Sequence, residues 1–264
     1  MKKLIWLMPV MLAACVSSGG GSSGGGSRRI REPVMQQQVA GEARTKAKTR
    51  VDLGSAYYQD RQFGAALEEA RKAVAADSGY APAQNLLALI YMELGQKGHA
   101  QDSFERALQL APEDPDISNN YGWFLCQNGQ EQKSLAYFQT ALDDPLYSTP
   151  ATALVNAGIC SLRMKDDKSA EGFLLRALQG DPGNIRALYQ VSDLYFRSGR
   201  FADARQRISE LHSRMEPTAE STWLALRIAR GLGNRRDEAA FMAALRRNFP
   251  NSAEYQKLQQ GQFQ

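Results

Sequence analysis

The stretch APAQNLLALIYMELGQKGHAQDSFERALQLAPED, from Ala81 to Asp114, contains two segments with the apolar spacing of α-helices. Gly95 separates the two segments, and Pro112 ends the second. Small residues lie where paired helices would approach most closely, and large residues lie beside them. Counted from Ala81, positions 7, 8, 11, 15, 20, 24, 27 and 32 are Leu87, Ala88, Tyr91, Gly95, Ala100, Phe104, Ala107 and Pro112. The stretch therefore predicts a helical hairpin of about 34 residues.

This spacing resembles that of the tetratricopeptide repeat (TPR). A single hairpin of this kind cannot bury its own apolar surface, so several must stack. The chain repeats the pattern near residues 47–80, 81–114, 115–148, 151–184, 185–218 and 219–252. We predict an all-α protein, a right-handed superhelical solenoid of about six TPR hairpins with a C-terminal capping helix within 251–264.

The turn glycines test this register independently. Gly95 and Gly129 are one 34-residue period apart, as are Gly199 and Gly233. The interval between Gly129 and Gly199 is two periods plus two residues, which we assign to the loop at 143–150. In the first repeat Ala70 occupies position 24, which usually holds a large apolar residue, so we expect looser packing or a groove there.

The first fifteen residues, MKKLIWLMPVMLAAC, have the layout of a secretory signal peptide. Their apolar run is too short to span a bilayer as a stable helix. Leu12 to Cys15 resembles the bacterial lipobox, which implies cleavage after residue 14 and lipidation of Cys15. The alternative is an ordinary secreted protein with an incidental cysteine. In lipoproteins of double-membrane bacteria, an aspartate directly after the lipidated cysteine usually means retention in the inner membrane. Here that residue is Val16, so the resemblance implies the outer membrane.

Residues 15–43 are expected to form a lipidated tether before a TPR domain at 44–264. Residues 16–27 read VSSGGGSSGGGS, a composition that is typical of a flexible linker, natural or engineered. The basic run at 28–31 is either a solvated linker or a contact for anionic head groups. The whole chain has a formal net charge of +4, but most of the excess lies before residue 51. The mildly acidic remainder argues against nucleic acid as a partner.

The sequence offers little for catalysis. Its two histidines, His99 and His212, are far apart, and no HExxH, paired CxxC or phosphate-binding loop is present. We expect no enzymatic activity, no metal, no small-molecule substrate and no cofactor besides the lipid on Cys15. Cys126 and Cys160 fall on successive first helices, where an oxidising compartment could join them. We favour two buried thiols instead, because repeat geometry already explains small residues there, and the pairing stays open.

The function is therefore expected to be the binding of a partner by surface side chains. In TPR stacks the first helices line a concave groove through positions 2, 5, 9, 12 and 13. Many residues at these positions are large and apolar here, which is typical of protein-binding sites. The predicted partner site comprises Val51, Ser55, Tyr58, Asn85, Leu89, Met92, Asn119, Trp123 and Gln127, with Trp123 the strongest candidate. Later repeats place Val155, Ile159, Leu162, Tyr189, Asp193 and Phe196 there. The alternative for each residue is burial between repeats.

Several segments contain residues that the TPR pattern does not itself require. They read NNYGWFLC (119–126), PLY (145–147), NAG (156–158), SLRMK (161–165), LALRIA (224–229) and FPNSAEYQ (249–256). With the lipobox and six repeats, the chain resembles the type IV pilus biogenesis and stability lipoproteins, the pilotins called PilF or PilW. The resemblance covers about residues 40–260 and the lipobox. The long Gly/Ser tether departs from the family pattern.

The resemblance implies a lipoprotein on the periplasmic face of the outer membrane. It would bind the type IV pilus secretin subunit, with the groove toward the N-terminal repeats, and promote the localisation and multimerisation of that subunit. The alternative is an envelope TPR scaffold that recruits a cell-wall enzyme or a barrel-assembly factor.

Overall fold

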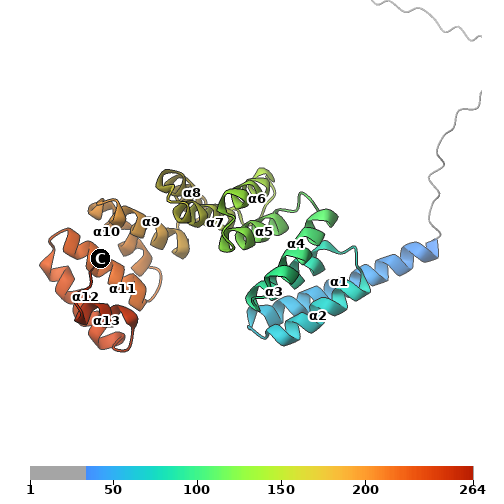
Figure 1. Cartoon of the computed structure of the whole chain (residues 1–264), viewed down its shortest axis with the longest axis horizontal. Helices are drawn as coiled ribbons and strands as arrows, with labels where there is room; N and C mark the ends of the chain where they lie inside the picture. Colours follow the sequence, from blue (N-terminus) through green and yellow to red (C-terminus); the bar gives the residue numbers. More distant parts are fainter. Residues whose placement is uncertain (1–33, 264) are drawn as a thin grey trace, which may run out of the picture. The chain divides into compact units, whose positions relative to one another are not determined.

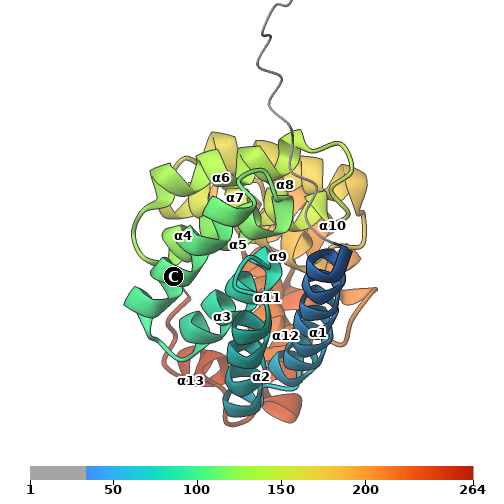
Figure 2. The same ribbon diagram turned by 90° about the vertical axis from the view of Figure 1, so that its right-hand side faces the viewer.

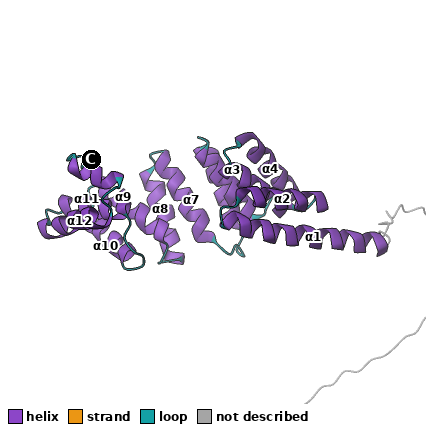
Figure 3. Ribbon diagram, turned by 90° about the horizontal axis from the view of Figure 1, so that it is seen from below, coloured by secondary structure: helices purple, strands orange, loops and turns teal. Residues whose placement is uncertain are grey.

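The computed structural model describes residues 34–263, and the side chains from residue 41 onward. The predicted signal peptide, Cys15 and the Gly/Ser segment lie outside the described residues. The chain divides into two units, Met1–Val39 and Ala40–Gln264, and the second holds the repeats. Between residues 34 and 263 the secondary structure consists of helices without a strand (Figure 3).

Within residues 34–263, six helical hairpins and one terminal helix follow each other in sequence (Figure 1). The helices are α1 (Val34–Gln59), α2 (Phe63–Ala76), α3 (Ala81–Glu93), α4 (Lys97–Leu110), α5 (Pro115–Gln127), α6 (Glu131–Asp143), α7 (Pro150–Arg163), α8 (Asp167–Gly180), α9 (Ile185–Arg197), α10 (Phe201–His212), α11 (Ala219–Gly231), α12 (Arg235–Asn248) and α13 (Ala253–Gln259). None of these described helices is both long and apolar enough to cross a membrane.

The hairpins stack as the repeat pattern requires. From α3 onward each first helix packs on its own second helix, and the second helix packs on the next first helix. The first helices α3, α5, α7, α9 and α11 also contact one another in sequence, and α13 packs on α11 and α12. Figure 2 shows α1 and α2 side by side in front. The predicted all-α TPR solenoid with a terminal capping helix is confirmed.

Close helix pairing explains the glycines at position 8. A Cβ atom on Gly158 would lie 2.7 Å from Cγ of Leu174, and one on Gly122 would lie 2.9 Å from Cε1 of Phe138. Such distances are well below van der Waals contact. These glycines therefore allow the large residue at position 24 to reach the backbone of the partner helix.

The turn inside each hairpin needs one residue in the left-handed backbone region. Gly95, Gly129, Gly199 and Gly233 have φ values between 67° and 79°. The first and fourth repeats lack this glycine, and Arg61 and Lys165 adopt φ values of 59° and 61° in its place. The tertiary structure thus imposes the same turn on residues that rarely adopt it, because the hairpin must close at that point.

Two expectations about the N-terminal end are wrong. Helix α1 begins at Val34, so residues 34–43 are helical and not part of the flexible tether. This segment has no proline, and its glutamines, alanines, methionine and glutamate are residues that favour helices. Nor does Ala70 leave a groove, because it is fully buried in a cluster with Leu86 and Leu87 of α3. The next repeat therefore supplies the volume that position 24 lacks.

Candidate partner-binding surface

The candidate surface consists of the partly exposed side chains on the first helices, and we call it the first-helix surface. Of the nine predicted partner-binding residues, Val51, Ser55, Tyr58, Asn85, Leu89, Met92 and Trp123 are partly exposed, and Gln127 is exposed. Asn119 is only 6% exposed. Eight of the nine are thus accessible to a partner, and Asn119 is not.

The N-terminal part of this surface is apolar and continuous across α1 and α3. Val51, Tyr58, Leu89 and Met92 all pack against one buried cluster while keeping part of their surface exposed. They lie at positions 5, 9 and 12 of successive repeats, so they project from the same side of neighbouring helices. The result is a preformed row of apolar side chains that a partner could cover.

Tyr58 links the two helices of this row. Its hydroxyl donates to a carboxylate oxygen of Glu93 at 3.5 Å, and its ring lies 5.8 Å from that of Phe63. Burial, with a smaller effect from Glu93, raises the pKa of Tyr58 to about 12. Tyr58 is therefore neutral at physiological pH, and the row carries a hydrogen-bonding group without a charge of its own.

Asparagine pairs continue from this row to the middle repeats. The amide of Asn120 donates to the side-chain oxygen of Asn85 at 3.3 Å, which joins α5 to α3. The amide of Asn156 donates to the side-chain oxygen of Asn119 at 3.0 Å, which joins α7 to α5. The assignment of Asn119 to the partner site is thus corrected, because its side chain is buried in a bond between repeats.

Trp123 has a mixed environment. It is partly exposed, as predicted, but it also packs against a buried cluster that contains Cys126 and Phe138. The guanidinium of Arg186, two repeats further along, lies 5.5 Å from its ring. Trp123 therefore contributes to the packing of α5 as well as to the surface. Less of its ring is free to contact a partner than the prediction of a main anchor assumed.

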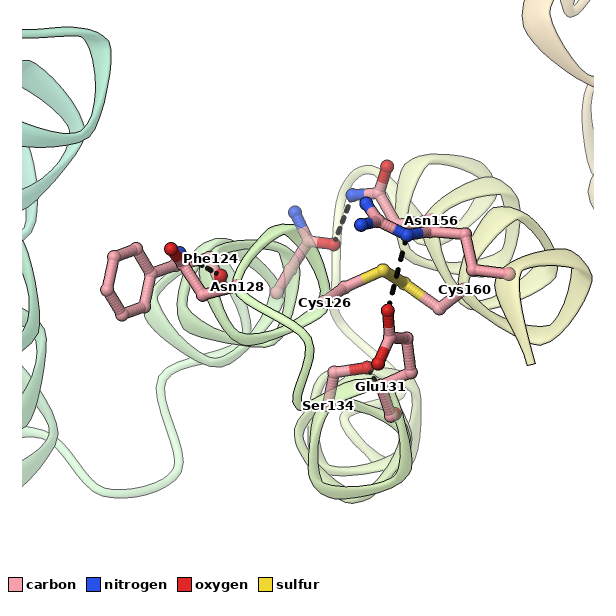
Figure 4. Close-up of a disulfide and its surroundings, with 9 residues drawn as sticks. Phe124, Cys126, Asn128, Glu131, Ser134, Asn156 and Cys160 are labelled. Carbon is pink, nitrogen blue, oxygen red and sulfur yellow. Dashed lines mark hydrogen bonds and ion pairs between the residues drawn. A yellow bond between two sulfur atoms is a disulfide. The ribbon is translucent and has the colours of Figure 1, made fainter. Parts of the chain in front are cut away.

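A disulfide joins Cys126 of α5 to Cys160 of α7 (Figure 4). The two Cα atoms are 5.9 Å apart, within the usual range for this bond. The preference for two separate buried thiols is therefore wrong. The sequence placed both residues on successive first helices, and the contact between those helices brings them into bonding distance.

An ion pair also joins the third and fourth repeats near this disulfide. Arg163 of α7 lies 3.3 Å from Glu131 of α6 (Figure 4).

In the C-terminal part of the first-helix surface, charged side chains of the next repeat contact two aromatic residues. The guanidinium of Arg227 lies 4.3 Å from the ring of Phe196, and the hydroxyl of Tyr189 donates to Glu220 at 2.9 Å. Val155, which the position rule also placed on this surface, is buried. No pattern in the sequence indicates Arg227 or Glu220 as contacts of this surface, because both come from the next repeat. Phe196 and Tyr189 are therefore already in contact with charged side chains of the same chain.

We found no group of three or more His, Cys, Asp or Glu residues that could hold a metal ion among the described residues. His99 is exposed on α4, and His212 is half-buried at the end of α10. The Nε2 atom of His212 lies 3.0 Å from Oγ of Ser221. Burial lowers the pKa of His212, so it is neutral at physiological pH.

Comparison with known proteins supports the repeat assignment. Two tetratricopeptide-repeat family models match residues 81–114 and 103–136. Solved structures that share only about a fifth of their residues with this chain also match, including the TPR protein YrrB at 20% identity and a TM-score of 0.50. At that identity the likeness concerns the fold alone.

Three further matches are more specific. The chain is 33% identical to PilW, described as a widely conserved type IV pilus biogenesis factor, with a TM-score of 0.76 over 81% of this chain and 98% of that structure. The structure of Pseudomonas aeruginosa PilF matches with 26% identity and a TM-score of 0.75, over 84% and 99% of the two chains. In sequence, the chain is 26% identical to the type IV pilus assembly protein PilF of Pseudomonas aeruginosa over 209 residues, 79% of this chain and 83% of PilF.

Proposed function

Since this chain belongs to the PilF/PilW family of type IV pilus biogenesis TPR proteins, we propose that it is a pilotin for the pilus secretin. In this proposal Cys15 is lipidated and holds the protein on the periplasmic face of the outer membrane. The first-helix surface binds a segment of the secretin subunit and promotes its localisation and multimerisation. The role is one of binding, without catalysis or a cofactor.

One observation supports the proposed binding mode above the others. Val51, Tyr58, Leu89 and Met92 form an apolar row on α1 and α3 that remains partly exposed. A partner that covers such a row removes apolar surface from water, which contributes about 25 cal/mol for each Å² buried. We therefore place the secretin segment on α1 and α3, and give Trp123 a secondary role.

The N-terminal cysteine provides a direct test of the tether. Acyl chains on Cys15 would each contribute about 0.8 kcal/mol per buried methylene, so several chains would anchor the protein firmly. Anchoring also raises the effective concentration of the binding surface at the membrane without new contacts. We expect Cys15→Ser to release the protein into the soluble periplasmic fraction and to mislocalise secretin rings, while purified protein binds the secretin normally. Full outer-membrane rings in this variant would contradict the tether.

The binding surface is tested by the double variant Leu89→Ser/Met92→Ser. Both side chains contribute to the proposed interface, so we expect binding to the purified secretin subunit to weaken by about tenfold or more. The matched control is Ile159→Ser/Leu162→Ser, which changes the same two positions of the fourth repeat, where both residues are also partly exposed. This control should bind the secretin as the unmodified protein does.

The outcomes separate the proposal from its alternatives. Equal binding by all three proteins would place the secretin site elsewhere, and a loss confined to the control would move it to the later repeats. Thermal melting followed by circular dichroism must first show that both double variants fold. Recovery of only cell-wall enzymes or barrel-assembly proteins from detergent-solubilised envelopes would instead favour a general envelope scaffold.

A further inference from the structure

A pocket of about 440 Å³ lies at the C-terminal end of the repeats, between α12 and α13. Its wall on the α12 side is formed by Ala239, Met242 and Ala243, and Leu258 and Phe263 line the opposite side. Met242 is 39% exposed, one of the few large apolar side chains so open in the described chain. This apolar pocket is distinct from the first-helix surface, because α12 is a second helix.

The pocket is preformed, because its wall is held by contacts outside it. The ring of Phe263 stacks on that of Trp223, a buried residue of α11, at 5.6 Å. On another side the guanidinium of Arg230 lies 3.5 Å from the centre of the Phe263 ring. The Ser252 side chain caps α13 by accepting from the amide of Tyr255 at 3.1 Å. An incoming side chain would therefore meet an ordered apolar wall.

Positive charge lies at both ends of the pocket wall. Arg246 lines the pocket, one turn beyond Met242 and Ala243. Arg235 and Arg236 lie one turn before Ala239 on α12. All three arginines are exposed, and none forms an ion pair with another described residue. From Arg235 to Arg246 the helix rises about 16 Å.

These charges are not explained by the stability of α12. Arg246 lies in the last turn, where a cation interacts favourably with the helix dipole, but Arg235 and Arg236 occupy the first two positions, where a cation is unfavourable. The acidic residues of the same turn are already paired, Asp237 with Arg205 at 3.1 Å and Glu238 with Arg230 at 3.2 Å. Residues that oppose a local rule in this way are expected at functional sites.

We propose that this pocket is a second docking site, which takes an acidic amphipathic helix of a partner protein. The apolar side chains of the partner helix would cover Met242, Ala239 and Ala243. The two alanines are small enough for the partner helix to approach α12 closely. Carboxylates near the two ends of the partner helix would pair with Arg246 and with Arg235 and Arg236. A second copy of this chain is a poor occupant, because it would bring the same arginines together. The site is independent of the proposed secretin site.

The test uses the full-length chain in detergent and a labelled synthetic peptide of about 15 residues, with central leucines at helical spacing and glutamates in its first and last turns. We expect binding in fluorescence anisotropy, and a loss of about tenfold or more when lysines replace the glutamates. Arg246→Glu and Met242→Asp should each weaken binding to a similar extent. Arg106→Glu, an exposed arginine on α4, is the matched control and should leave binding unchanged.

Three outcomes would overturn the proposal. They are the absence of peptide binding, equal binding of the acidic and basic peptides, and equal binding by the Arg246→Glu variant. Phosphatidylglycerol vesicles are titrated in parallel. Vesicle binding that Arg246→Glu removes, without binding of the acidic peptide, would assign the pocket to a lipid surface instead.

Discussion

Replacing Phe104 by alanine is expected to lower the free energy of unfolding by about 3 to 5 kcal/mol, the range for truncating a buried phenylalanine. Phe104 is fully buried at position 24 of the second repeat. Its ring lies 5.6 Å from that of Tyr121 and 5.5 Å from that of Phe124, both on α5. The substitution would therefore leave a cavity at the contact between two repeats. Guanidinium chloride unfolding, followed by circular dichroism, measures the change.

The matched control is Phe104→Leu, which keeps most of the volume and should cost less than about 1.5 kcal/mol. Ala70 occupies the same position in the first repeat and shows that alanine is tolerated where neighbours fill the space, since Leu86 and Leu87 pack into its cluster. A loss below about 1 kcal/mol for Phe104→Ala would mean that the second repeat collapses in the same way.

Removing the disulfide between Cys126 and Cys160 is expected to lower the free energy of unfolding by about 3 to 4 kcal/mol. The bond closes a loop with a sequence separation of 34, and a cross-link of that length restricts the unfolded chain by about this amount. Both cysteines are fully buried in the cluster that contains Phe138, so the disulfide is shielded from solvent in the folded protein. Unfolding with and without dithiothreitol measures the effect.

The control is the double variant Cys126→Ala/Cys160→Ala, which should be insensitive to dithiothreitol and close in stability to the reduced protein. Each single alanine variant should lose about as much as the double variant, because either change removes the whole bond. Equal stability of the oxidised and reduced proteins would contradict a structural role for the disulfide. Such a result would mean that contacts between α5 and α7 hold these repeats together without the cross-link.

The sequence determined the repeat architecture because TPR packing depends on local spacing. The small residues at positions 8 and 20, the large residue at 24 and the turn glycine recur in most of the repeats, with the period of the hairpin. Gly158 and Leu174 illustrate why, since the absence of a Cβ on one allows the other to reach the helix. The same position rule identified Val51, Tyr58, Leu89 and Met92, which the structure places on one partly exposed apolar row.

The tertiary structure decided what depends on contacts between repeats. Asn119 became buried because Asn156 of the next repeat bonds to it, and Trp123 and Phe196 are approached by arginines from later helices. Cys126 and Cys160 pair because two first helices lie in contact. The pocket between α12 and α13 likewise combines residues that share no sequence pattern. Period and spacing fix the hairpin itself, but exposure and pairing depend on which side chains the neighbouring hairpin presents.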